Sequence, residues 1–227
     1  MSPAQSFTNA LAINPRGQIV GRYDTTDGQA HGYLLSDGVV TTIDVPGAAG
    51  FTVATDINPS GEIVGRYRTS DGRFHGFLLA DGQFTTIDYP GAIGIQGMAI
   101  NASGTIAGYY VDAASRFHGF VLDDGVYTTI DPPGSVMTGG PSGVLKINPA
   151  GDVAGNFTMV PDMGMGMMMM RCGFIYRNGA FVIYHVPGAS STGITGINPQ
   201  GDVVGFYVDS AGRQHGFLAP RGTAENQ

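Results

Sequence analysis

Two charged residues of opposite sign, Asp56 and Lys146, each stand directly before the isoleucine of an Ile-Asn motif. Three further copies of that motif carry small residues at the same position, Ala12, Ala99 and Gly196. A lysine amine in a desolvated site can have a lowered pKa and act as a nucleophile or base, and a nearby carboxylate can steer it. We therefore predict Lys146 and Asp56 as catalytic candidates. A structural ion pair, or packing of the two side chains between neighbouring elements, is the interpretation that competes with catalysis.

Sulfur-containing side chains gather in one stretch, where the methionine-rich segment Met159 to Met170 is followed by the single cysteine, Cys172. Thioether and thiolate ligands are soft and favour Cu(I), so Met165, Met167 and Met169 with Cys172 are predicted as copper(I) ligands. Methionine is also a flexible apolar filler and an adaptable contact surface. A packed lid, or a loop that docks a protein partner, is therefore the alternative that we favour for this segment.

Five copies of one repeat position these residues. The Ile-Asn motif of the copies begins, in order, at Ile13, Ile57, Ile100, Ile147 and Ile197. A His-Gly-aromatic unit follows in four copies, at His31, His75, His118 and His215, and Cys172 replaces the histidine in the fourth copy. A Thr-Thr-Ile-Asp motif completes the first three copies and ends at Asp44, Asp88 and Asp131. The regular spacing predicts one structural unit that is repeated five times.

Each copy is predicted to form four short antiparallel strands, which in the second copy span 51–57, 62–68, 74–79 and 83–88. The Asn58 to Gly61 segment has the composition of a type I turn between the first two strands. Four antiparallel strands at this period are typical of a propeller blade, which buries its faces against its neighbours. We therefore predict one all-β domain over residues 1–227, a five-bladed β-propeller ring whose repeats start near residues 7, 51, 94, 141 and 191. The last blade is expected to be incomplete or to be closed by the N-terminus.

The His-Gly-Phe unit, the Asn-Pro-x-Gly turn and the period resemble the bacterial HAF-type extracellular repeat proteins, over nearly the whole chain. The resemblance implies secretion or an envelope location, extracellular or periplasmic. These repeats as a group carry no defined activity, so the resemblance informs the fold more than the function.

The recurring histidines suggest a ring of metal ligands, yet their predicted placement argues against it. On the third strand of each blade, equivalent residues of neighbouring blades should lie more than about 10 Å apart. Zinc–nitrogen bonds of about 2 Å cannot span that distance. We interpret the histidines, and the Thr-Thr-Ile-Asp carboxylates, as structural residues that are bonded within their own blades.

Residues that break the repeat are better functional candidates, and the fourth copy breaks it most often. It has Asn156-Phe157 where the first two copies have Arg-Tyr, and His185 where the first three have aspartate. His185 is also a candidate additional copper ligand. The long connection before this copy contains Met137, and in a blade this connection and the methionine-rich loop emerge on the same face. We therefore predict a ligand site at the mouth of the central channel, formed by Asn156, Phe157, His185 and Met137.

Composition excludes several classes of function. The net charge of −7 argues against binding to nucleic acid or to an anionic membrane surface, and no apolar stretch approaches the length of a membrane span. Only two glutamates are present, Glu62 and Glu225, so a glycosidase with paired carboxylates is hard to assemble. The absence of tryptophan weakens a lectin interpretation without excluding it.

The sequence thus predicts a secreted or envelope-associated propeller that binds a small molecule or a glycan. An enzyme that uses Lys146 and Asp56 in the channel is the first alternative. A scaffold that docks a protein partner through the Met159 to Met170 loop is the second. No cofactor is predicted beyond the copper(I) candidate.

Overall fold

The computed structural model describes residues 5–136, 145–159 and 169–222, in which all regular structure is β-strand. Within these residues, three four-stranded sheets form blades 1 to 3, and one seven-stranded sheet comprises blade 4, with four strands, and blade 5, with three. The units are blade 1, with β1 (Gln5–Ile13), β2 (Ile19–Thr25), β3 (Ala30–Ser36) and β4 (Val39–Ile43); blade 2, with β5 (Thr52–Ile57), β6 (Ile63–Arg68), β7 (Phe74–Ala80) and β8 (Gln83–Ile87); blade 3, with β9 (Gly94–Ile100), β10 (Ile106–Val111), β11 (Phe117–Asp123) and β12 (Val126–Thr129); blade 4, with β13 (Lys146–Ile147), β14 (Val153–Met159), β15 (Met170–Arg177) and β16 (Ala180–Tyr184); and blade 5, with β17 (Ser191–Ile197), β18 (Val203–Val208) and β19 (Gln214–Ala219).

The asparagine turn predicted from the sequence closes the first hairpin of each blade. In blade 2 the Gly61 amide donates to the Asn58 carbonyl at 3.0 Å, and the Asn58 side-chain oxygen accepts from the amides of Ser60 and Glu62. The left-handed backbone at Gly61, with φ of 93°, explains why glycine stands there. Strands β5 and β6 then pair in antiparallel register from Ile57 opposite Ile63.

The same asparagines join successive blades. The side-chain amide of Asn14 donates to the carbonyl of Asn58 at 3.1 Å, and Asn58 donates to the carbonyl of Asn101 at 3.2 Å. Asn101 and Asn148 continue this ladder into blades 4 and 5. Apolar clusters lie beside it between the blades, as where Val20 of blade 1 packs with residues such as Ala54 of blade 2. The core is therefore a series of layers between neighbouring blades.

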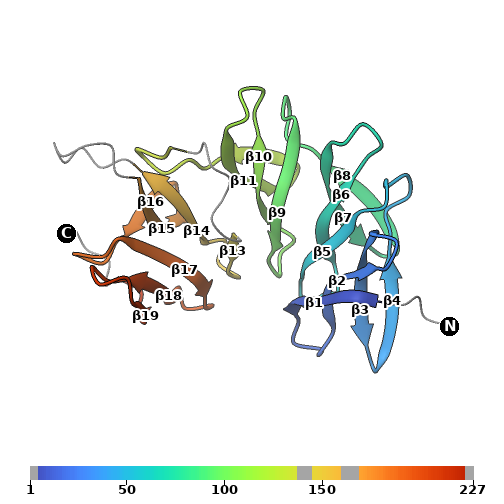
Figure 1. Cartoon of the computed structure of the whole chain (residues 1–227), viewed down its shortest axis with the longest axis horizontal. Helices are drawn as coiled ribbons and strands as arrows, with labels where there is room; N and C mark the ends of the chain where they lie inside the picture. The colour runs from blue at the N-terminus through green and yellow to red at the C-terminus, as the bar shows by residue number, and fades with distance from the viewer. Residues whose placement is uncertain (1–4, 137–144, 160–168, 223–227) are drawn as a thin grey trace.

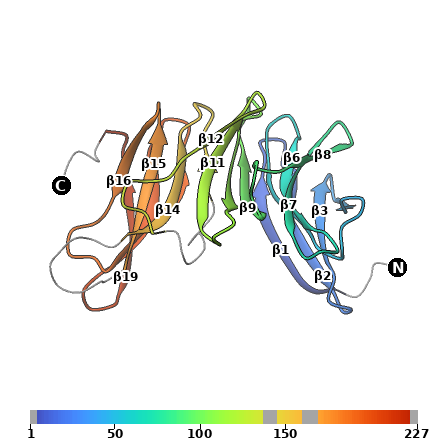
Figure 2. The ribbon, with the colours of Figure 1, turned by 90° about the horizontal axis from the view of Figure 1, so that it is seen from above.

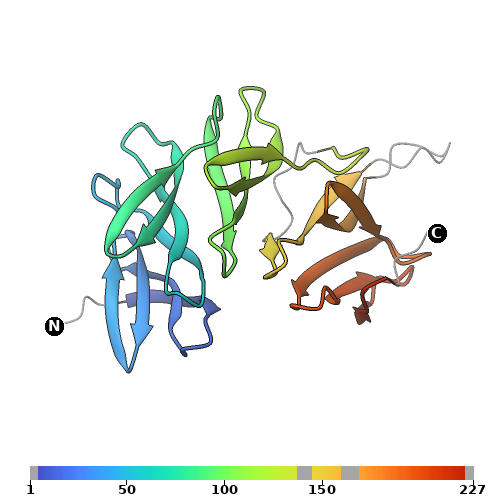
Figure 3. The same cartoon turned by 180° about the vertical axis from the view of Figure 1, so that it is seen from behind.

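The five units form an open arc, not the closed ring that the sequence predicted. Figures 1 and 3 show blade 1 and blade 5 at opposite ends of the arc, and Figure 2 shows the blades side by side along it. Every substantial contact between described strands of different blades joins neighbours along the chain. Ile13, at the free face of blade 1, is 65% exposed, whereas its equivalent Ile57 is 5% exposed. Blade 1 thus leaves uncovered a surface that an internal blade buries.

Blade 5 is the incomplete unit within the described residues. Its strand β17 adjoins blade 4 through a parallel bridge between Ser191 and Arg171. Strand β1 pairs with β2 in blade 1, at the far end of the arc, and residues 1–4 and 223–227 lie outside the described part. No helix of the described residues is long and apolar enough to cross a membrane.

Candidate functional site

Asp56 and Lys146, the predicted catalytic pair, lie on the inner strands of blades 2 and 4. The two carboxylate oxygens of Asp56 accept from the amides of Ile57 and of Ile100, each at 3.0 Å, so Asp56 links blade 2 to blade 3. Burial raises the pKa of Asp56, while these hydrogen bonds and the charge of Lys146 oppose the rise. The charge of Lys146 therefore favours the ionised form of Asp56, although the two side chains make no ion pair.

Asn156 and Phe157, two of the predicted ligand-binding residues, lie in the interior. The Asn156 amide donates to the Ile194 carbonyl at 2.8 Å, and its oxygen accepts from the Ile194 amide at 2.6 Å. Phe157 packs in the core beside Phe174. His185 is exposed just after β16, and Met137 lies outside the described residues. In the described structure, Asn156 thus fastens blade 5 to blade 4.

The predicted copper ligands fall only partly within the described residues. Met165 and Met167 lie outside them, Met169 is 65% exposed, and Cys172 is fully buried on β15. Burial raises the pKa of the Cys172 thiol to about 11, which keeps it protonated and reduces its value as a soft ligand. The part of the chain that the structure describes holds no group of three or more His, Cys, Asp or Glu side chains suited to a metal ion.

The recurring histidines bond within their own blades. The Nδ1 atoms of His31, His75 and His118 lie 2.9, 2.9 and 2.7 Å from the carboxylates of Asp44, Asp88 and Asp131. A tyrosine of the second strand packs against each imidazole, as Tyr23 does on His31 with 5.1 Å between ring centres. This geometry agrees with the structural role that recurrence suggested.

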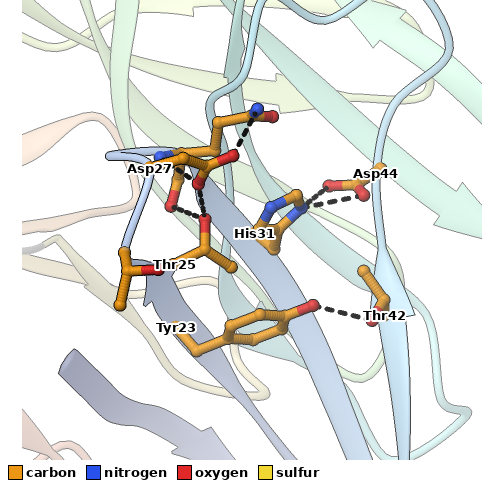
Figure 4. A pocket seen from close by; sticks show the side chains of 8 residues that line it. Tyr23, Thr25, Asp27, His31, Thr42 and Asp44 are labelled. Atoms are coloured by element: carbon orange, nitrogen blue, oxygen red, sulfur yellow. Dashed lines mark hydrogen bonds and ion pairs between the residues drawn. The ribbon is translucent and has the colours of Figure 1, made fainter. Parts of the chain in front are cut away.

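One of these pairs also lines a pocket. A hollow of about 430 Å³ opens beside His31 and Asp44 in blade 1 (Figure 4). It is lined by Tyr23, Thr25, Thr26, Asp27, Gln29, His31, Thr42 and Asp44. A smaller hollow of about 140 Å³ shares Gln29, His31 and Asp44, and extends to Gly50, Phe51 and Thr52 where blade 2 begins. We call the lining of these two hollows, at the outer junction of blades 1 and 2, the first seam.

His31, like His75 of blade 2, has no hydrogen-bond partner for its Nε2 among the described residues, unlike the histidines of blades 3 and 5. In blades 3 and 5, Nε2 lies 3.2 Å from Asp112 for His118 and 2.9 Å from Asp209 for His215. Thr25 takes the place of that aspartate in blade 1, and the His31 Nε2 has no hydrogen-bond partner among the described residues. Figure 4 shows this nitrogen on the side of the ring away from Asp44.

The first seam differs from the junction of blades 2 and 3 in the side chain at its outer rim. The position before the third strand is Gln29 in blade 1 and Arg73 in blade 2. Arg73 extends across the junction of blades 2 and 3, where its guanidinium donates to the carbonyls of Ala92 and Ile93 at 2.8 and 3.4 Å. Gln29 instead donates to Asp27 of its own loop at 3.0 Å.

The next residue follows the same pattern, with Ala30 in blade 1 and Phe74 in blade 2. No site was predicted here, because the sites predicted from the sequence came from departures in the fourth copy and from Asp56 of the second. The Gln29-Ala30 pair, set against Arg73-Phe74 and Arg116-Phe117, was the available signal.

Comparison with known proteins identifies the fold alone. No family model matches the sequence, and no curated protein matches it. Solved β-propellers do match. The propeller domain of the Trilobed protease from Pyrococcus furiosus has a TM-score of 0.63 at 9% identity, with 96% of this chain and 70% of that chain covered.

Two further matches have different functions in their descriptions. An Aleuria aurantia lectin in complex with α-methyl-L-fucoside has a TM-score of 0.55 at 13% identity, covering 95% and 74% of the two chains. A gluconolactonase from Xanthomonas campestris has a TM-score of 0.51 at 16% identity, covering 97% and 78%. This chain is therefore an all-β protein built from propeller-type blades.

Proposed function

We propose that this chain is a binding module that holds a carbohydrate in the first seam. The observation that carries the proposal is the set of hydrogen-bond acceptors that converge there. Asp27 and Asp44 supply carboxylate oxygens, and in the tautomer whose Nδ1–H donates to Asp44 the His31 ring presents Nε2 as an acceptor. Ligand hydroxyl groups are the natural donors for such a surface.

The apolar walls of the first seam suit the same ligand. Tyr23 stacks on the imidazole, and Phe51 lines the smaller hollow. Sugar rings present apolar faces as well as hydroxyls, and ligand sites commonly combine such walls with a few fixed polar groups. Lectins among the structural neighbours, one of them in complex with a fucoside, support a sugar-binding use of this architecture.

Location is part of the proposal. The HAF-type resemblance favours an extracellular or periplasmic protein, and a module that binds glycans would meet its ligands there. We place the protein outside the cytoplasm on that ground.

A calorimetric panel of methyl glycosides, including methyl α-L-fucoside, tests the proposal. We expect one member to bind the wild-type protein, and the Gln29→Arg variant to lose that binding because the new side chain should cross the seam as Arg73 does. Arg213→Gln, a change at the equivalent position of blade 5, is the matched control and should bind normally. Absence of binding across the panel, or equal binding by Gln29→Arg, would overturn the proposal.

An enzyme that acts in the channel is the second candidate, favoured by the electrostatic influence of Lys146 on Asp56. Lys146→Met would then abolish turnover of a lactone or glycoside substrate and leave ligand binding intact. The channel-mouth site over blade 4 and the protein-docking role of the Met159 to Met170 loop stay predictions, because Met137 and much of that loop lie outside the described residues.

A further inference from the structure

A cluster of arginines surrounds one aromatic ring between blades 1 and 2. The guanidinium carbon of Arg22 lies 5.3 Å from the centre of the Phe51 ring, that of Arg66 lies 5.6 Å from it, and that of Arg68 lies 5.9 Å from it. Arg66 also lies 5.1 Å from the ring of Phe74. The chain has only 11 basic residues and a net charge of −7, so three of them around one ring is a local excess of positive charge.

The arginines differ in how their charge is balanced. Arg22 makes a two-pronged pair with Asp24, with both nitrogen–oxygen distances at 2.6 Å. Arg68 is exposed, and donates to the Ala49 carbonyl at 3.5 Å. Arg66 is half-buried, yet its guanidinium makes no ion pair and no hydrogen bond with any residue that the structure describes. Burial and the charge of Arg22 both lower the pKa of Arg66, so the described residues give this cation no compensation beyond the two rings.

The equivalent positions of the later blades show that the fold does not require a charge there. Blade 3 has Tyr109, whose hydroxyl donates to the Asn156 carbonyl at 3.4 Å. Blade 4 has Asn156, which bonds the backbone of β17, and blade 5 has Phe206. Neutral side chains thus serve the packing between blades in blades 3 to 5. The arginines of blades 1 and 2 need a different explanation.

We propose that Arg66, supported by Arg22, binds the carboxylate group of a small acidic ligand beside Phe51. A guanidinium that stacks on aromatic faces keeps its N–H donors at its edge, in the planar fork that matches a carboxylate. The bound anion supplies the negative charge that no described side chain provides to Arg66. This site shares the Phe51 ring with the first seam but uses none of the polar groups assigned there to sugar binding, so variants of Arg66 test it separately.

Calorimetric unfolding with sodium acetate and sodium glucuronate, each against sodium chloride at equal ionic strength, tests the site. Because a ligand that binds only the folded state stabilises it, both carboxylates should raise the Tm of the wild-type protein above its value in chloride. Glucose, which lacks the carboxylate, should not raise the Tm through this site. A stronger effect of glucuronate than of acetate would assign the site to sugar acids, and equal effects would assign it to carboxylates in general.

The Arg66→Met variant gives the decisive comparison. Methionine preserves the apolar stem and removes a poorly compensated charge, so this variant should unfold at the wild-type Tm or higher in chloride. It should bind glucuronate at least about tenfold more weakly by titration calorimetry, a loss of about 1.4 kcal/mol. Arg66→Lys keeps the charge without the fork and should bind between the two, while Arg213→Met is the control for a general loss of positive charge. Equal Tm values of wild-type protein in chloride and carboxylate, or an undiminished response of Arg66→Met, would overturn the proposal.

Discussion

The junction between blades 2 and 3, which we call the second seam, is the counterpart of the first seam. The two seams share their inner framework of hydrogen bonds and differ in the side chains at their outer rims. Both are held on the inside by the asparagine ladder, and both carry a tyrosine, a histidine and an aspartate in the same arrangement. At the outer rim, Arg73 crosses the second seam, whereas Gln29 turns back onto its own loop. The difference shows that a recurring structural pair becomes a candidate site when the residues beside it leave it uncovered.

The largest expected effect comes from the frame that the two seams share. Asn14→Ala and Asn58→Ala should each destabilise the protein by about 2–3 kcal/mol, because each leaves buried backbone groups without partners. Asn198→Ala should cost less, since Asn198 lies in the last blade and its amide bonds only Asp202 of its own turn among the described residues. Denaturant unfolding measures all three. A cost for Asn198→Ala equal to that for Asn58→Ala would contradict the ladder as the link between blades.

A smaller effect, on sugar binding, is expected from giving the Nε2 atom of His31 an aspartate partner. The double change Thr25→Asp/Asp27→Ala gives blade 1 the pattern of blade 3, where Asp112 occupies the histidine Nε2. Sugar binding should then weaken about tenfold or more, or about 1.4 kcal/mol. The matched change in the second seam, Thr69→Asp/Asp71→Ala, should leave binding unaltered. If calorimetry finds that the two double variants lose sugar binding to the same extent, the first seam is not the specific binding site.

The His118 pair of the third blade gives a prediction about pH dependence. Burial lowers the pKa of His118, but hydrogen bonds to Asp131 and Asp112 outweigh it, so the pKa is raised above its ordinary value. The stability that His118 contributes is therefore complete below the unfolded value of about 6.5, and is lost as the pH rises through the raised folded value. The deficit of Asp112→Asn relative to wild type, measured by urea unfolding, should shrink as the pH rises from 6 to 9. A constant deficit would contradict the charged pairing.

The smallest expected effect is the stability change on opening the second seam. Arg73→Gln removes exposed hydrogen bonds to Ala92 and Ile93, and should cost less than about 1 kcal/mol. Urea unfolding measures it. A cost of several kcal/mol would mean that Arg73 holds the blades together and does not merely cover the rim.

The repeat made the blades predictable, because the Ile-Asn turns and Asp-Gly pairs specify local backbone geometry in every copy. The strands and hairpins of the second copy accordingly lie where its pattern indicated. Ring closure depends on the angle between blades, which arises from the packing of side chains distant in sequence. No repeat unit encodes that angle by itself, so the open arc was not predictable.

The candidate site shows a different limit. Recurrence correctly suggested a within-blade role for His31, but it treated all the copies as equivalent. Whether Nε2 of an imidazole is occupied depends on the residue six positions earlier, Thr25 in blade 1 and Asp112 in blade 3. Comparing copies position by position, at Gln29 as well as in blade 4, is what would have drawn attention to the first seam.

The number of sugar sites per chain tests the central claim most directly. Titration calorimetry with the methyl glycoside that binds the wild-type protein should give one site for wild type, none for Gln29→Arg, and a second site for Arg73→Gln. The exchange of one side chain at equivalent positions would then close one seam and open the other. An unchanged single site in Gln29→Arg would contradict the account, because the ligand would then lie elsewhere on the molecule.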